Sequence, residues 1–260
     1  MTIDKSRRAA LAGFGALAAG AAALAAGPTR AATAERIIPP GAGELSELMD
    51  RLRRAPRRRD FRAVPMILQH PDFWDHEALN EIIAYRGTRK QVWDNTDLAG
   101  PWLNLMRNSI NAQIFSFGHQ DFLAISATHG TAHLALFDPQ MWDKYQFAAL
   151  AGAKFRTSTL AAPKVASTDF SQSEDPKSLF GPNGDTIPAL QERGVVFMAC
   201  HNAIWEVTAK LIADSNNPDH ASHEAVAAEL TNHLIDGAVL TPGIAATIPE
   251  LQQVGFHYAT

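Results

Sequence analysis

The chain has very little cysteine: Cys200 is the single one among 260 residues. A lone cysteine excludes an internal disulfide, so the fold must be stabilised by an apolar core. After residue 27, no apolar run reaches the roughly 20 residues that a membrane-spanning helix needs. The glycine-rich nucleotide-binding loops and the G-x-S-x-G turn of serine hydrolases are also missing.

Neither sign of charge is in strong excess, with 23 Lys and Arg against 27 Asp and Glu. This balance excludes a general nucleic-acid-binding protein, which needs a marked basic excess. We therefore expect no nucleic acid among the partners. The length suits one domain, or one domain with an extension.

The first 34 residues have the features of an export signal. A basic start with the pair Arg7-Arg8 precedes an apolar stretch rich in Ala and Gly, and Ala32-Thr33-Ala34 provides a cleavage site. The paired arginines indicate the twin-arginine route. We predict a periplasmic protein without a stable membrane span after cleavage. The alternative is an uncleaved anchor. Cleavage would leave 226 residues with 19 basic and 26 acidic side chains, a net charge of −7.

Residues 35–88 are predicted to form an N-terminal helical extension. Leu45, Leu48, Met49 and Leu52 are spaced as on one face of a helix, and residues 71–85 indicate a second helix with Asp72 or Asp75 as its cap. Seven arginines occur between Arg51 and Arg62. We expect them to be solvated, the alternative being an anion-binding patch.

From residue 89 to 260, apolar strands alternate with helical segments, which predicts an α/β domain with a mostly parallel sheet between helices. Strands are expected at 90–95, 121–130, 194–200 and 237–243, and residues 244–260 are expected to form a helix and a short tail. Residues 156–185 are rich in Ser, Pro, Asp and Gly, so we predict a long loop there.

Ligand sites in parallel sheets form at the carboxyl ends of the strands. His129 ends one predicted strand, and Cys200, His201 and Asn202 end another. Asn108 lies on the first helix of the sheet domain. We expect these five residues to meet at one edge of the sheet.

Four segments resemble the DsrE/DsrF-like family of small α/β proteins: RNSIN (107–111), ATHGTAHLAL (127–136), ALQERGVVFMACHN (189–202) and VLTPGIAATIPELQQVGFHYA (239–259). The resemblance covers residues 89–260, and its last two segments are the most specific. The loop at 156–185, the segment around 213–233, the N-terminal extension and the export signal depart from the family pattern.

The resemblance implies a sandwiched parallel sheet that assembles into homotrimers or hexamers. It also implies a sulfur carrier, or sulfurtransferase-like protein, that holds a persulfide on Cys200 and works with a sulfur donor or acceptor protein. His201 and His129 would then be the catalytic residues beside the thiol, and Asn202 and Asn108 would shape the substrate site.

The residues themselves leave two roles open for Cys200. A thiol just before a helix lies near the positive end of that helix, which lowers its pKa and makes it a better nucleophile. A free cysteine is, however, also among the residues most often buried in a core.

Ten histidines are many for this length. With Cys200 they suggest a non-enzymatic alternative, a binding or assembly protein that holds Cu, Zn or a small ligand. Since none of the strong metal-ligand spacings is present, we expect neither a metal nor another cofactor.

Overall fold

In this computed structural model, the part that is described comprises residues 37–152, 154–161 and 170–260. The predicted export signal lies outside these residues, as does part of the loop predicted at 156–185. The described residues belong to a compact unit that spans Ala34–Thr260.

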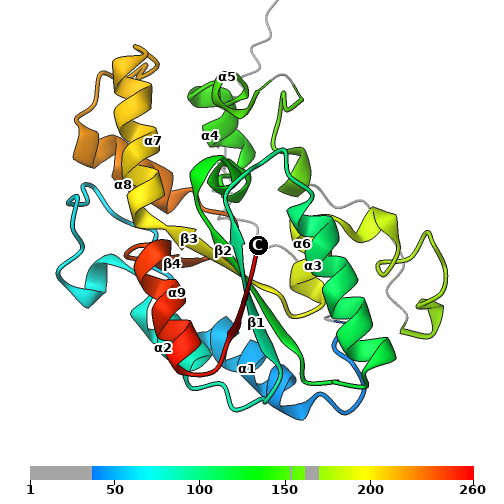
Figure 1. Ribbon diagram of the computed structural model, residues 1–260. Coiled ribbons are helices and arrows are strands. Elements are labelled where there is room, and N and C mark those ends of the chain that lie inside the picture. Colours follow the sequence, from blue (N-terminus) through cyan, green and yellow to red (C-terminus); the bar gives the residue numbers. More distant parts are fainter. Residues whose placement is uncertain (1–36, 153, 162–169) are drawn as a thin grey trace, which may run out of the picture. The chain divides into compact units, whose positions relative to one another are not determined.

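A parallel sheet with the strand order β4-β3-β2-β1-β5 forms the centre of this unit (Figure 1). Its strands are β1 (Lys90–Asn95), β2 (Leu123–Thr128), β3 (Val196–Cys200), β4 (Val239–Thr241) and β5 (His257–Ala259). The predicted α/β class is confirmed, since every strand pair is parallel and helices surround the sheet. The short tail expected at the end of the chain is instead β5, which pairs with β1.

The α-helices are α1 (Gly43–Arg54), α2 (His76–Ile83), α3 (Trp102–Asn111), α4 (Pro139–Lys144), α5 (Ala148–Ala151), α6 (Ile187–Glu192), α7 (His201–Ala213), α8 (His223–Asn232) and α9 (Ile244–Gln253). Shorter helical turns include a π-turn after α3 at Ala112–Ser116 and a 3₁₀ helix after β2 at Gly130–Leu136. A long loop was predicted at 156–185. In the described parts of this segment the structure contains only short 3₁₀ turns.

Two apolar cores cover the two faces of the sheet. One face packs against α1, α2 and α9 through alternating strand residues such as Val92, Ile125 and Met198. The opposite face packs against α3, α4, α6, α7 and α8 through Phe197 and Leu240, among others. Every residue of β2 and β3 is buried, as expected for central strands covered on both sides. The helices of residues 37–88 therefore belong to one face of the sheet.

The arginine-rich segment is bound to the edge of the sheet. Arg59 donates to the fully buried carboxylate of Asp75 at 2.9 Å, and Asp75 also accepts from the backbone N–H of Leu240 in β4 at 2.7 Å. Arg57 and Arg59 donate to the carbonyl of Ala238. The outer backbone groups of this edge strand are thereby paired, which protects the edge from pairing with another chain. Arg57 and Arg59 are thus bound to the protein rather than fully solvated, whereas Arg53, Arg54 and Arg62 are exposed, as expected.

None of the helices in the described part of the chain is long and apolar enough to cross a membrane.

Candidate functional site

Cys200 is the last residue of β3, and its side chain lies on the face of the sheet that α9 covers. The residue is only 4% exposed. Its Sγ atom accepts a hydrogen bond from the backbone N–H of Ile244, the first residue of α9, at 3.3 Å. Since α7 begins directly after Cys200, the sulfur is close to the amino ends of two helices.

Two opposing effects act on the pKa of Cys200. Burial is the larger one, and it raises the pKa of the thiol above its usual value. The backbone N–H groups of Ile244, Ala203 and Asn202 lower the pKa, because they stabilise negative charge on the sulfur. The net direction is upward, so the thiol is protonated at neutral pH in this conformation.

Asn202 lies beside this thiol, as the sequence predicted. Its side chain is exposed and reaches toward the start of α9, since a Cβ added at Gly243 would lie 2.8 Å from Asn202 Nδ2.

His129 follows β2 directly and forms a hydrogen-bonded cluster with two residues that the sequence did not single out. Its Nε2 donates to Asp94 Oδ1 at 2.7 Å, and the hydroxyl of Tyr258 donates to Asp94 Oδ2 at 2.7 Å. The hydrogen bond to Asp94, helped by slight burial, raises the pKa of Tyr258. A protonated Nε2 leaves Nδ1 of a neutral His129 free to accept a proton.

The strand register places His129 beside Cys200. Thr128 is opposite Ala199 in the parallel β2–β3 ladder, so the next position on each strand brings His129 opposite Cys200. His129 is still extended, and residues in register on parallel strands point to the same face. Neighbouring strands are about 4.8 Å apart. The two residues thus end adjacent strands at the carboxyl edge of the sheet, with the Nε2 atom of His129 directed toward β1, on the side of β2 away from β3.

His201 and His133 lie deeper at the same edge. His201 begins α7, is 1% exposed, and donates from Nε2 to the carbonyl of Pro65 at 2.8 Å. His133 is fully buried, and neither of its ring nitrogens has a hydrogen-bond partner. Burial, helped by the nearby His129 and His201, lowers the pKa of His133 to about 3. Three histidines thus lie near one another at this edge.

Asn108 does not join the others. It is exposed near the middle of α3, where its side-chain amide donates to Asn104 and its oxygen accepts from Arg107. The helix starts after the carboxyl end of β1 and runs back along the sheet, so each turn carries its residues farther from that edge. Asn108 is therefore separated from Cys200 and His129.

Asp94 and Tyr258 are the members that sequence reasoning missed. Asp94 is a carboxylate near the carboxyl end of a predicted strand, which is a usable signal. Tyr258 gave no such signal, because the strand β5 that positions it was expected to be an irregular tail.

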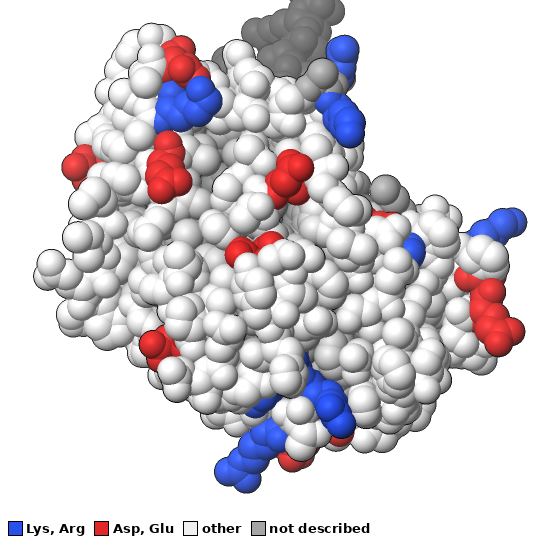
Figure 2. Space-filling model, viewed as in Figure 1, with Lys and Arg blue, Asp and Glu red and all other residues white. Residues whose placement is uncertain are grey.

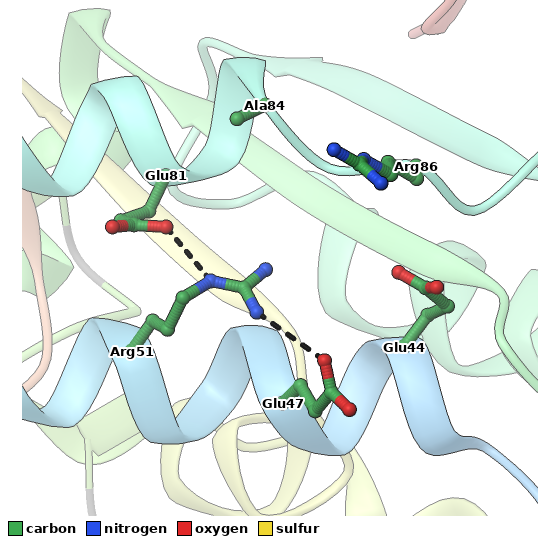
Figure 3. A pocket seen from close by; sticks show the side chains of 6 residues that line it. All are labelled: Glu44, Glu47, Arg51, Glu81, Ala84 and Arg86. Atoms are coloured by element: carbon green, nitrogen blue, oxygen red, sulfur yellow. Dashed lines mark hydrogen bonds and ion pairs between the residues drawn. The ribbon is translucent and has the colours of Figure 1, made fainter.

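A hollow of about 270 Å³ between α1 and α2 is a weaker candidate site (Figure 3). Arg51 fills its centre, with Nε at 2.8 Å from Glu81 and Nη1 at 3.6 Å from Glu47. Two of its three carboxylates, those of Glu47 and Glu81, are thus already paired with an internal cation. On the face seen in Figure 2, charged side chains of both signs are scattered over a mostly uncharged surface.

No group of three or more His, Cys, Asp or Glu side chains is arranged to hold a metal ion within residues 37–152, 154–161 and 170–260. The cluster at the carboxyl edge therefore consists of a thiol, an oriented imidazole and hydrogen-bonding groups. The backbone N–H groups around the sulfur can stabilise a thiolate once it has formed. Comparison of the chain with family models, curated proteins and solved structures finds no match.

Proposed function

We propose that this protein is a sulfur carrier, sulfurtransferase-like, that holds a persulfide on Cys200. The observation that carries the proposal is the position of the Cys200 sulfur, which faces backbone N–H groups at the amino ends of both α7 and α9. Those groups favour a negative sulfur, and His129 follows the end of the adjacent strand β2. The resemblance to the DsrE/DsrF-like family points to the same cysteine.

The reaction needs no oxidant if the donor carries sulfane sulfur, as thiosulfate does. The Cys200 thiol transfers its proton to Nδ1 of His129, and the thiolate attacks the outer sulfur of thiosulfate. A Cys–S–S bond forms while the sulfur–sulfur bond of thiosulfate breaks, and sulfite leaves with the electron pair. A thiolate of the acceptor then attacks the terminal sulfur and releases the Cys200 thiolate.

The proposal includes a local opening, because Cys200 is 4% exposed. The start of α9 packs against the sulfur through the backbone N–H of Ile244, so its displacement admits the donor. In the expected periplasmic setting, this cover also protects a single thiol from uncontrolled oxidation. Assembly into a homotrimer or hexamer would add to that protection.

Loading of Cys200 is tested by incubating the purified protein with thiosulfate or polysulfide and measuring its intact mass. We expect a gain of whole sulfur atoms that reductant reverses and that Cys200→Ser abolishes. A second measurement follows alkylation of Cys200 in native and in unfolded protein. If no sulfur is gained and the thiol reacts only after unfolding, Cys200 is a core residue and the proposal fails.

His129→Gln should slow sulfur loading, because the variant removes the proton acceptor beside the thiol. General-base catalysis typically contributes about 10²–10⁴-fold. We therefore expect a loss in that range, measured as the rate of mass gain at fixed thiosulfate. His233→Gln is the matched control, because His233 forms an equivalent 2.7 Å bond with Asp138 away from the thiol. Equal rates for the two variants would remove His129 from the mechanism.

A second candidate function is non-enzymatic binding of a small ligand at the same edge. It is favoured by the buried ring nitrogens of His133 and by Nδ1 of His201, which lack hydrogen-bond partners. The Cys200→Ser variant separates sulfur loading from binding by the histidines, since a ligand held by the imidazoles alone would still bind without the thiol. Metal analysis of protein purified after export by its own signal tests Cu and Zn directly.

A further inference from the structure

Asp94, His129 and Tyr258 meet at the carboxyl edge of the sheet, on the β1 side of β2. Tyr258 is opposite Val92 in the β1–β5 ladder, two positions before Asp94. His129, which is still extended, is two positions after Ala127, and Ala127 is opposite Asp94 in the β1–β2 ladder. Since residues two positions apart in an extended chain share a face, the three side chains lie on the same face of the sheet.

The three side chains offer an imidazole nitrogen, a carboxylate and a phenol oxygen, which are all used as metal ligands in proteins. Asp94 Oδ1 is 2.7 Å from His129 Nε2, and Asp94 Oδ2 is 2.7 Å from the hydroxyl oxygen of Tyr258. Bonds from such atoms to a first-row metal are about 2.0–2.2 Å long, so two ligands at a right angle are about 3 Å apart. Both measured separations are close to that value and are compatible with ligands of one ion.

The carboxylate of Asp94 has no permanent cation beside it. Among the ion pairs of the described residues, its only partner is His129, which is charged only when protonated. Its side chain is 20% exposed, so water screens the negative charge only in part. A metal cation at this edge would therefore meet a carboxylate that no Lys or Arg already neutralises, unlike those of Glu47 and Glu81 around Arg51.

The cluster is open to solvent. The side chain of His129 is 29% exposed and Tyr258 is 46% exposed, so an ion that keeps part of its water can reach both. Because Asp94 is 35 residues from His129 and 164 residues from Tyr258, ligand spacing in the sequence gives no sign of this set. A phenol oxygen completes it, since only two of its members are His, Cys, Asp or Glu.

We propose that Asp94, His129 and Tyr258 bind a ferric ion, with water at its remaining positions. Phenolate and carboxylate are hard, negatively charged oxygen ligands, and a trivalent ion is acidic enough to displace the phenol proton at neutral pH. Binding releases that proton to solvent without any electron transfer, and His129 coordinates through Nε2 with its proton on Nδ1. Sulfur loading that uses Nδ1 as the proton acceptor therefore belongs to the iron-free protein.

The test is titration of the purified, iron-free protein with ferric nitrilotriacetate, followed by visible absorbance and by iron analysis after gel filtration. We expect stoichiometric iron and a charge-transfer band from phenolate to ferric iron. Tyr258→Phe should abolish the band, and Asp94→Asn should weaken iron binding by about tenfold or more, which corresponds to ~1.4 kcal/mol. Tyr145→Phe is the matched control, because the Tyr145 hydroxyl also donates to a carboxylate, that of Glu229, which Lys144 already neutralises.

Three results would overturn the inference. The first is the absence of retained iron. The second is a band that persists in Tyr258→Phe or disappears in Tyr145→Phe, either of which would place the iron elsewhere. The third is an unchanged iron affinity in Asp94→Asn. Phenylalanine and asparagine keep the shapes of the residues they replace, so both variants should fold, and a thermal melt checks this. Tyr258→Phe leaves Cys200 and His129 in place, so sulfur loading by this variant tests the proposed function separately.

Discussion

Replacing Asp75 by asparagine should destabilise the protein by about 3–5 kcal/mol, the usual loss when one partner of a buried ion pair is removed. Asp75 is fully buried and accepts from Arg59, from the backbone N–H of Arg58 and from that of Leu240. Asparagine keeps the shape but removes the charge, which leaves the 18%-exposed Arg59 without its main counter-ion. Urea denaturation followed by circular dichroism measures the loss.

The control for this variant is Asp72→Asn. Asp72 is 69% exposed and lies 3.7 Å from Arg58, so its ion pair is screened by water. Its replacement should change the free energy of unfolding by no more than about 0.5 kcal/mol. If Asp75→Asn unfolds at the same urea concentration as Asp72→Asn, the buried pair does not hold the edge strand.

His133→Leu should make the protein less sensitive to acid. His133 is fully buried without a hydrogen-bond partner, and its pKa is lowered to about 3, so it is neutral in the folded state. In the unfolded chain, histidine binds a proton below about pH 6.5. The unfolded state therefore gains protons first, and stability falls as the pH falls from about 6.5 toward the folded pKa.

The size of this effect follows from the difference between the pKa of His133 in the folded protein and that of histidine in the unfolded chain. One pKa unit corresponds to about 1.4 kcal/mol, so His133 should account for a loss of about 2 kcal/mol between about pH 6.5 and pH 4.5. His201, whose pKa burial also lowers, adds to the loss in the wild-type protein. The variant should lose stability less steeply over this range, as measured by urea denaturation at a series of pH values. Leucine also removes two unpaired polar atoms from the core.

His70→Gln is the control for the pH series, since His70 is a 65%-exposed histidine at the surface. It should follow the wild-type curve. A His133→Leu curve that also follows the wild-type curve would show that the buried imidazole does not contribute to acid denaturation.

Much of the fold follows from local sequence patterns. The apolar run that ends at Cys200 and the run before His129 were predicted as strands, because continuous apolar segments of this length suit strands buried on both faces. The helix with Leu45, Leu48, Met49 and Leu52 inward was also predicted, and these four residues are buried in α1. Short strands gave weaker signals: β5 has three residues, two of them exposed, and was expected to be irregular.

The candidate site was only partly predictable. His129 and Cys200 were expected at one edge, because carboxyl ends of parallel strands share an edge, and the two residues do end the adjacent strands β2 and β3. Asn108 was expected there too, but the direction of α3 carries it away. The bond from His129 to Asp94 joins residues 35 positions apart, and the bond from Tyr258 to Asp94 joins residues 164 apart. No local pattern encodes such pairs.

The sequence by itself determined the class of the fold, the positions of the main strands and the placement of Cys200 between a strand and a helix. Those properties depend on periodicity and on near neighbours in the chain. Only the tertiary structure decided that the arginine-rich segment binds the β4 edge through Asp75, that Cys200 is covered by α9, and that His133 is buried without a partner. These depend on burial and on contacts between distant segments, which exist only after the helices have packed on the sheet.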